Sequence, residues 1–420
     1  MIQTLPGFRD FYPADCAARQ FVFDRWRETA RRYGFTEVDG PVLEGVDLYK
    51  KKSGGELVGQ LFDFTDKGGR EVALRPEMTP TLARMVAARD REFKKPLKWF
   101  SVASFFRYEK PQKGRLREFV QLNCDLIGEA SPAADAEMIA LAVDLLRACG
   151  LTADDFYLRV NDRNVWLDFL RARGVATERA DEFLQIIDKL ERERPEVTAQ
   201  KLEPFGVTRE ELDAFLARPA SELGGALGTL EADLRARGLL DFVTFDPRIV
   251  RGLVYYTGVV FEVFDRGRKS RALAGGGRYD ELIGLLSDGA VRHPAFGFAV
   301  GDVTLLDLLR ELPHTAARLD AAVRSAAAPE VYVVVADEEF RPQALGLVGA
   351  LRAAGRRTDF ALTPAKVGKQ FQTAETLGAR RVAVVGREWP TVKLKTLASR
   401  EEVPVNADDL PTVLGSLPAE

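Results

Sequence analysis

Histidine and cysteine are scarce in this sequence. Its 420 residues include only two histidines, His293 and His314, and three cysteines that form no CxxC pair, Cys16, Cys124 and Cys149. This pattern excludes a disulfide framework, a zinc knuckle and a histidine-rich centre, so no metal is expected on protein histidine or cysteine. If the protein is an enzyme, we expect arginine, glutamate, glutamine and tyrosine to be its working residues.

A long apolar run and a strong net charge are absent as well. No apolar stretch reaches the length of about 18 residues that a membrane-spanning helix needs. The opening residues, MIQTLPGFRDFYPAD, lack the basic start and apolar run of a signal peptide. The net charge of −3 means that any nucleic-acid surface must be a local patch. We therefore expect a cytoplasmic protein without membrane contact.

The length predicts two or three domains. Apolar spacing predicts a helix over 14–34, and period-two alternation with turn signals predicts strands between about 60 and 128. Another helix is expected over 130–150, ending at a glycine. The charged, proline-broken stretch 163–240 lacks strand alternation, and we interpret it as a helical insertion.

The pattern changes again in the C-terminal half. Strands are expected over 241–246 and 248–265. Residues 313–329 are alanine-rich without a clear core face, which favours a linker. From 330 to 420, strands and helices alternate, which predicts a small, largely parallel α/β domain with helices on both faces of its sheet.

The segment FFRYEKPQKGRLREFVQ (105–121) concentrates charged side chains between aromatic ones. Two expected strands flank its loop. Alternation places Arg107 and Glu109 on one face of the first strand, and Phe119 and Gln121 on one face of the second. The alternatives are a polar floor that binds a ligand and a solvated edge hairpin, and this stretch taken alone favours the hairpin.

VALRPEMTPTLAR (72–84) presents a carboxylate and a hydroxyl within a constrained loop. Glu77 and Thr79 lie between Pro76 and Pro80. Prolines hold such a loop in extended or turned conformations. The loop suits a substrate ammonium group, and a proline-rich surface turn is the alternative.

Two later stretches are also candidates. RGLVYYTG is expected to belong to a strand, with Arg251 and Tyr255 on one face and Tyr256 on the other. It suits a phosphate and a ring together, or simply a packed aromatic pair. AGGGRYDE (274–281) allows close backbone approach through its three glycines, but it matches neither common phosphate-loop pattern.

In this order, these stretches resemble the class II aminoacyl-tRNA synthetases, and among them the histidine–tRNA ligase family. LPGFRDFYP resembles the family's start, YGFTEVDGPVLE its motif 1 and FRYEKPQKGRLREFVQ its motif 2. LVYYTG and GGGRYD are similar to two signatures of the histidine-specific members. KQFQTAETLGARRVAVVG is similar to part of an anticodon-binding domain, so the resemblance covers nearly the whole chain.

The resemblance implies an α+β fold. It implies an antiparallel-sheet catalytic core over 1–312 with its helical insertion at about 163–240, a linker over 313–329 and an anticodon-binding-like α/β domain over 330–420. The implied activity is ATP-dependent activation of L-histidine to histidyl-adenylate, followed by transfer to tRNA(His). Mg²⁺ accompanying ATP and a homodimer formed through motif 1 follow from the same resemblance.

The resemblance also implies site residues, position by position. Arg107 and Arg251 would be the catalytic cations on the α-phosphate. The implied histidine-binding residues are Glu77, Thr79, Arg107, Gln121, Asp125, Arg251, Tyr255 and Tyr256. The implied ATP-binding residues are Arg107, Glu109, Arg115 and Phe119.

Three positions depart from the family pattern. Met78 replaces the glycine of RPEGT, Val254 replaces the aspartate of RGLDYYTG, and Thr304 replaces the motif 3 arginine that holds the γ-phosphate. Removing one preorganised donor costs about 2.7–4 kcal/mol of transition-state stabilisation. Lys113 and Arg115 are therefore candidates to supply the missing charge.

These departures leave two alternatives open. An inactive relative would serve as the regulatory subunit of ATP phosphoribosyltransferase in histidine biosynthesis, but such proteins typically lack the C-terminal tRNA domain. A tRNA-binding or sensing module would keep that domain and discard Arg107 and Arg251. Residues 330–420 and both arginines are present, and this favours the ligase.

Overall fold

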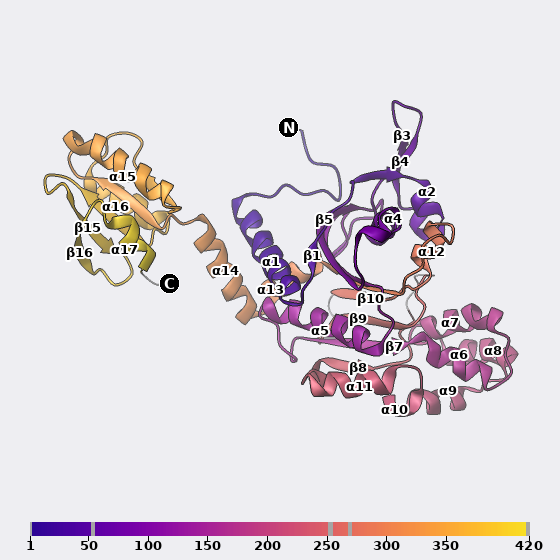
Figure 1. Cartoon of the computed structure of the whole chain (residues 1–420). Coiled ribbons are helices and arrows are strands. Elements are labelled where there is room, and N and C mark those ends of the chain that lie inside the picture. The colour runs from indigo at the N-terminus through magenta and orange to yellow at the C-terminus, as the bar shows by residue number, and fades with distance from the viewer. Residues whose placement is uncertain (1, 52–54, 251–254, 268–270, 417–420) are drawn as a thin grey trace. The chain divides into compact units, whose positions relative to one another are not determined.

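The chain forms two compact units in the computed structural model (Figure 1). The first comprises residues up to Arg318 apart from Phe11–Ala18, and the second comprises Phe11–Ala18 together with residues from Leu319 onward. The expected α+β class with a C-terminal α/β domain is confirmed by the sheets of the two units. The structure describes residues 2–51, 55–250, 255–267 and 271–416.

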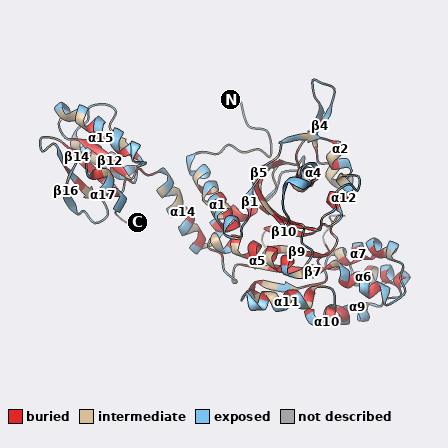
Figure 2. Ribbon diagram, in the orientation of Figure 1, coloured by how far each residue is buried: buried red, intermediate tan, exposed pale blue. Residues whose placement is uncertain are grey.

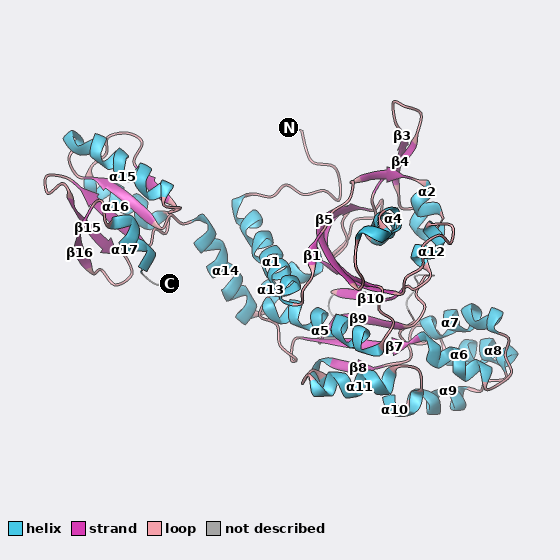
Figure 3. Ribbon diagram, in the orientation of Figure 1, coloured by secondary structure: helices cyan, strands magenta, loops and turns pink. Residues whose placement is uncertain are grey.

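An eight-stranded sheet forms the centre of the first unit (Figure 3). Its strands are β1 Thr36–Glu37, β5 Leu97–Phe106, β6 Glu118–Ile127, β7 Phe156–Asp162, β8 Val243–Phe245, β9 Val259–Asp265, β10 Ala274–Arg278 and β11 Ala295–Gly301. They lie in the order β1-β5-β6-β11-β10-β9-β7-β8. The interior pairings are antiparallel, and only the two edge pairings, β1 with β5 and β8 with β7, are parallel.

A three-stranded antiparallel sheet lies before β5 in the chain, in the order β2-β4-β3. Its strands are β2 Leu43–Gly45, β3 Phe62–Thr65 and β4 Glu71–Leu74. The hairpin predicted at DKGGRE joins β3 to β4. The carboxylate of Asp66 accepts hydrogen bonds from the backbone N–H groups of Gly68 (2.8 Å) and Arg70 (2.9 Å), which closes the turn.

Helices of the first unit pack on this framework. Outside the insertion they are α2 Asp47–Lys50, α3 Gly55–Val58, α4 Thr79–Ala88, α5 Pro132–Ala148, α12 Leu282–Leu286 and α13 Asp302–Glu311. Helix α1, Pro13–Arg32, belongs to this unit from Arg19 onward. Most of α5 is buried (Figure 2), and this helix packs on β11. A helix that is apolar around most of its circumference is expected in a core. Helices α1 and α5 confirm the helices predicted at 14–34 and 130–150.

The stretch 163–240 is helical, as its lack of strand alternation predicted. Its α-helices are α6 Arg163–Arg171, α7 Ala180–Lys189, α8 Pro195–Leu202, α9 Arg209–Leu216, α10 Ala220–Leu223 and α11 Leu227–Ala236, and no strand occurs between residues 163 and 240, all of which are described. Four aromatic rings pack together here, and the centroids of contacting rings are 4.6–6.0 Å apart: Trp166, Phe169, Phe183 and Phe215. This aromatic cluster gives the insertion a hydrophobic core of its own.

The second unit contains a five-stranded mixed sheet. Its strands are β12 Val331–Val335, β13 Thr358–Phe360, β14 Arg381–Val385, β15 Thr391–Thr396 and β16 Glu402–Asn406, in the order β13-β12-β14-β15-β16. β12 pairs in parallel with β13 and β14, whereas β15 and β16 are antiparallel. The expectation of a largely parallel sheet is wrong for 391–406, because a short turn there reverses the chain without a crossover helix.

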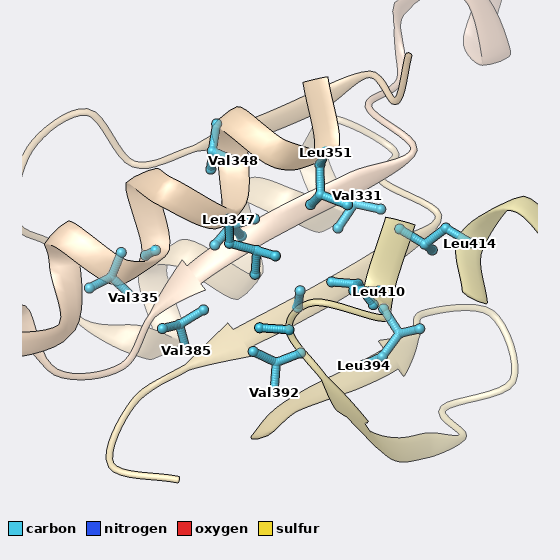
Figure 4. Packing of buried hydrophobic residues seen from close by; sticks show 14 residues of the cluster. Val331, Val335, Leu347, Val348, Leu351, Val385, Val392, Leu394, Leu410 and Leu414 are labelled. Carbon is cyan, nitrogen blue, oxygen red and sulfur yellow. The ribbon is translucent and has the colours of Figure 1, made fainter. Parts of the chain in front are cut away.

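Helices cover both faces of this sheet, as predicted. On the face that carries Val331, one helix contributes Leu347 and Leu351, and another contributes Leu410 and Leu414 (Figure 4). Ala374 of a third helix packs in the separate cluster on the other face. These helices are α15 Arg341–Ala353, α17 Leu410–Ser416 and α16 Val367–Thr376, respectively.

Residues 313–329, expected to be a linker, contain α14, which spans Pro313–Ala327. Alanine has the highest helix propensity, and proline is favoured at a first helical position. The hydroxyl of Thr315 donates to the carbonyl of Leu309 (2.8 Å), and the Thr315 side chain is buried. The segment is thus helical over most of its length, and its role as a linker stays a prediction.

Close strand packing at Gly276 leads to a stability prediction. A Cβ atom on Gly276 would lie 2.2 Å from the Cβ of Phe298 and 2.3 Å from the carbonyl oxygen of Gly297. We expect Gly276→Ala to destabilise the first unit by about 3 kcal/mol, because the backbone of β11 cannot give way. Gly45→Ala is the matched control, since no atom lies within 4 Å of a Cβ there. Equal denaturant midpoints for the two variants would contradict the prediction.

Candidate active site

A cavity of about 750 Å³ lies in the first unit. It collects side chains from the loop before α4, the β5–β6 connection, β6, the segment before β9, and the junction of β11 with α13. Nine of the residues implied by the family resemblance line it: Glu77, Thr79, Arg107, Glu109, Arg115, Phe119, Gln121, Tyr255 and Tyr256. Segments far apart in the sequence therefore meet at one concave site, which is typical of a ligand-binding pocket.

The loop that carries Glu77 is held in place by hydrogen bonds from the buried side chain of Arg75. Arg75 is 2% exposed, and its guanidinium donates to Asp39 Oδ1 (2.7 Å) and to the carbonyl oxygen of Ser104 (3.0 Å). Glu77 itself is 8% exposed and receives the hydroxyl of Tyr255 at 3.4 Å. The alternative of a solvated proline-rich turn is therefore excluded, and a buried carboxylate faces the cavity.

Met78, one of the departures from the family pattern, fills a core position. It precedes α4 and is 1% exposed. It packs in a cluster with Ala103 and Phe105 of β5. The methionine thus adds hydrophobic contact beneath the cavity and leaves Glu77 and Thr79 on the cavity side.

β6 and the β5–β6 connection build the floor of the cavity. β5 ends at Phe106, so the expected placement of Arg107 and Glu109 on a strand face is wrong, and both residues belong to the connection. The antiparallel register of β5 and β6 pairs Phe105 with Phe119, and β6 also pairs with β11 on its other side. The guanidinium of Arg107 lies 5.3 Å from the centroid of the Phe119 ring, and its Nε donates to the carbonyl of Pro76 (3.1 Å). Because β6 is interior in the sheet, the edge-hairpin alternative is excluded.

Asn123 strengthens the interpretation of this floor as a ligand site. It is 5% exposed, lines the cavity, and follows Gln121 by two positions on the same face of β6. Its Nδ2 has no hydrogen-bond partner in the described part of the chain. Buried donors without partners are rare in folded proteins, and a bound ligand would satisfy this one.

The loop between β5 and β6 is organised by ion pairs. The Arg115 guanidinium pairs with the carboxylate of Glu109, and both line the cavity. Gly114 at the tip has φ = 73°, a conformation that glycine adopts at little cost. Lys113 instead pairs with Glu311 (3.0 Å), which raises the pKa of the lysine, and Lys113 does not line the cavity.

Asp125 lies behind the floor of the cavity and does not line it. Its Oδ1 receives the hydroxyl of Tyr279 at 2.6 Å, and both side chains are buried. A Cβ atom at Gly297 would lie 2.1 Å from Asp125 Oδ1, so glycine at 297 makes room for this carboxylate. Direct contact of Asp125 with a substrate stays a prediction.

The strand expected over 248–265 is shorter than predicted. β9 begins at Val259, and Tyr255 and Tyr256 precede it with ring centroids 4.9 Å apart. Both rings line the cavity, so the expected placement on opposite strand faces is wrong. The backbone N–H of Thr257 is bound by the carbonyl of Arg278 (2.8 Å), and this contact with another segment outweighs the strand propensity of the aromatic residues.

Several expected features lie elsewhere. Arg251 and Val254 are outside the described residues. Neither histidine lines the cavity: His293 hydrogen-bonds Asp90 (2.7 Å) and His314 hydrogen-bonds Asp155 (3.2 Å). The described residues contain no group of three His, Cys, Asp or Glu side chains arranged to hold a metal, and none of their helices is long and apolar enough to cross a membrane.

The cavity also contains residues that the sequence analysis did not identify. Arg271, Glu262 and Asp302 line it together with the predicted set. Asp302 begins α13, and Arg271 lies shortly before β10. A cation beside the glycine-rich stretch AGGGRYDE was a usable signal for Arg271, but only the tertiary structure brings it next to the β5–β6 loop.

Comparison with known proteins agrees with this geometry. Residues 7–306 match the family model described as Histidyl-tRNA synthetase. The chain belongs to the histidyl-tRNA synthetase family. Residues 330–417 of this family member match the model described as Anticodon binding domain. The family and the C-terminal domain inferred from sequence resemblance are thereby confirmed.

Individual relatives of this histidyl-tRNA synthetase family member point the same way. The histidine–tRNA ligase of Opitutus terrae is 45% identical over 426 residues, covering 96% of this chain and 95% of that protein. The crystal structure of histidyl-tRNA synthetase from Nostoc sp. is similar with a TM-score of 0.78 and 25% identity over 99% of both chains.

A structure from Bacillus halodurans, titled as an ATP phosphoribosyltransferase regulatory subunit/histidyl-tRNA synthetase, matches with a TM-score of 0.69 over 89% of this chain and 96% of that one. Its sequence identity is 23%, so this likeness concerns the fold alone.

The bond between Tyr279 and Asp125 gives a prediction about the integrity of the site. Burial raises the pKa of Tyr279 well above its ordinary value, so its hydroxyl stays a donor at neutral pH. We expect Tyr279→Phe to lower the free energy of unfolding by about 1–3 kcal/mol, because a buried carboxylate loses a partner. The control is Tyr108→Phe, at an exposed tyrosine, with an expected change within about 0.5 kcal/mol. Indistinguishable urea midpoints would show that the bond contributes nothing.

Proposed function

We propose that this chain activates L-histidine with ATP to form histidyl-adenylate and then transfers the histidyl group to tRNA(His). The observation that carries the proposal is the single cavity, in which the buried carboxylate of Glu77, the guanidinium of Arg107 and the Phe119 ring come together. Such a set suits an amino acid, a phosphate and an adenine base held side by side. Membership of the histidyl-tRNA synthetase family and the anticodon-binding domain support the same function.

In the proposed first step, a carboxylate oxygen of histidine attacks the α-phosphorus of ATP. The bond from that phosphorus to the bridging oxygen breaks, and pyrophosphate leaves. Two anions must approach one another, so the reaction depends on positioning and on fixed cations. Arg107 would hold the α-phosphate, because a planar guanidinium binds phosphate through two donors and keeps its charge. Arg251 would assist it, as the resemblance implies.

The remaining site residues divide between the two substrates. Glu77 and Thr79 would bind the ammonium group of histidine, Gln121 and Asp125 its polar atoms, and Tyr255 and Tyr256 would line the imidazole pocket. Phe119 would stack on the adenine, with Glu109 on the adenine side. Arg115 would reach the outer phosphates or the acceptor end of the tRNA.

Magnesium enters this scheme as part of the substrate, MgATP. The described carboxylates do not form a three-ligand cluster, and Asp302 in the cavity is already bound by Arg9 and by the backbone N–H of Val120. Mg²⁺ commonly binds through substrate phosphates with only one or two protein carboxylates. The ion would neutralise charge on the triphosphate while the arginines fix its position.

In the proposed second step, a terminal ribose hydroxyl of the tRNA attacks the histidyl carbonyl. AMP leaves, and the hydroxyl proton passes to solvent or phosphate. No protein nucleophile is needed, which is consistent with a cavity lined by arginine, glutamate and tyrosine. We further propose a homodimer formed through motif 1, and a cytoplasmic location, because the three cysteines are all free and suit a reducing compartment.

The second candidate function is that of a regulatory subunit of ATP phosphoribosyltransferase. Its support is the fold likeness to the Bacillus halodurans structure and the threonine at position 304. The C-terminal domain at 330–417 favours the ligase, since a subunit without tRNA chemistry has no use for an anticodon-binding domain.

The two functions are separated by activity measurements. We expect histidine-dependent exchange of labelled pyrophosphate into ATP, and attachment of labelled histidine to tRNA(His). Histidine binding without either activity would contradict the proposal and favour the regulatory subunit.

A single substitution tests the histidine end of the site. We expect Glu77→Gln to raise the KM for histidine about ten- to a hundredfold in pyrophosphate exchange, because the ammonium group loses its charged acceptor. The KM for ATP should stay within about twofold. Glu92→Gln, at an exposed glutamate outside the cavity, is the control. An unchanged histidine KM would remove Glu77 from the ammonium site.

A further inference from the structure

Arg271 lies beside the tip of the β5–β6 loop and lines the cavity. A Cβ atom placed on Gly114 would lie 3.9 Å from the Cγ and Cδ of Arg271 and 3.2 Å from the methyl carbon of Thr304. The stem of Arg271 and the side chain of Thr304 are therefore both neighbours of Gly114, although the three residues are far apart in the sequence.

The charges at this end of the cavity are not balanced within the chain. Arg115 is matched by Glu109, and Lys113 is occupied by Glu311. Arg271 makes no hydrogen bond or ion pair with any residue in the described ranges. Burial and the like charge of Arg115 lower the pKa of Arg271, yet arginine remains charged at neutral pH. Two guanidiniums thus share a single carboxylate, which leaves net positive charge for an anion.

We propose that Arg271 binds the outer phosphates of ATP and supplies the positive charge that Thr304 does not. The inference rests on the proposed function, because it takes the cavity to be the ATP site. Thr304 is 8% exposed and offers one hydroxyl, so it cannot neutralise a phosphate. Arg271 approaches the same loop tip from the segment before β10 and presents a guanidinium, whose donors bind phosphate oxygens in pairs.

Arg271 is not the residue that the sequence predicted as a substitute for the motif 3 arginine. Lys113 and Arg115 were the candidates there, but Lys113 lies outside the cavity lining and Arg115 is paired with Glu109. Both arginines would contact the triphosphate, but the charge of Arg115 is already partly neutralised by Glu109. The triphosphate is expected to lie between the β5–β6 loop and the segment before β10.

The test measures nucleotide binding without catalysis. Dissociation constants of MgATP and AMP are determined by calorimetry, without histidine or tRNA, for the unmodified chain, Arg271→Gln and Arg235→Gln. We expect Arg271→Gln to weaken MgATP binding about ten- to a hundredfold and to change AMP binding less than about twofold, because only the outer phosphates lose a charged partner. Arg235 pairs with Glu231 on α11 away from the cavity, so Arg235→Gln should change neither constant.

Unchanged MgATP affinity in Arg271→Gln would overturn the inference. An equal loss of MgATP and AMP affinity would also overturn it, since Arg271 would then support the nucleotide site as a whole. Histidine affinity of the same variant, expected within about twofold of the unmodified chain, verifies that the site is folded. Failure of the unmodified chain to charge tRNA(His) would contradict the proposed function and leave the binding result on Arg271 to be judged separately.

Discussion

The buried carboxylate of Asp302 joins the parts of the first unit on which the cavity depends. Its Oδ1 accepts the backbone N–H of Val120 in β6, and its Oδ2 accepts the guanidinium of Arg9 from the N-terminal segment (both 2.9 Å). The side chain is fully buried, and removing either partner would leave a buried polar oxygen without its hydrogen bond. Strand β6, the start of helix α13 and the N-terminal residues around Arg9 are therefore fixed relative to one another.

Sheet pairing extends this constraint across the cavity floor. β6 lies between β5 and β11, and β11 lies between β6 and β10. The floor residues on β6 thus face a junction, from β11 to α13, that is built from a distant part of the sequence. Gly276 and Gly297 allow the strands and the Asp125 carboxylate to approach closely behind the floor. A site assembled from interior strands is rigid, which suits a reaction that depends on positioning.

Alternation and helical spacing in the sequence predicted the strands and helices whose formation depends on neighbouring residues. Period-two alternation identified β5, β6 and the shared face of Phe119 and Gln121, and helical spacing identified α1 and α5. The segment before β9 was mispredicted, because a long-range hydrogen bond from Thr257 to the carbonyl of Arg278 sets its path. Arg271 could not be connected with Gly114 and Thr304 from sequence, because that proximity arises only in the folded sheet.

We propose that one cavity holds both substrates, with the α-phosphate of ATP at Arg107. A crystal structure of the chain with ATP and histidinol, which lacks the attacking carboxylate, would show whether both substrates bind there. We expect adenine on the Phe119 ring, the α-phosphate within hydrogen-bonding distance of Arg107, and the histidinol ammonium group at Glu77. A triphosphate bound outside this cavity, or histidinol bound away from Glu77, would contradict this proposal.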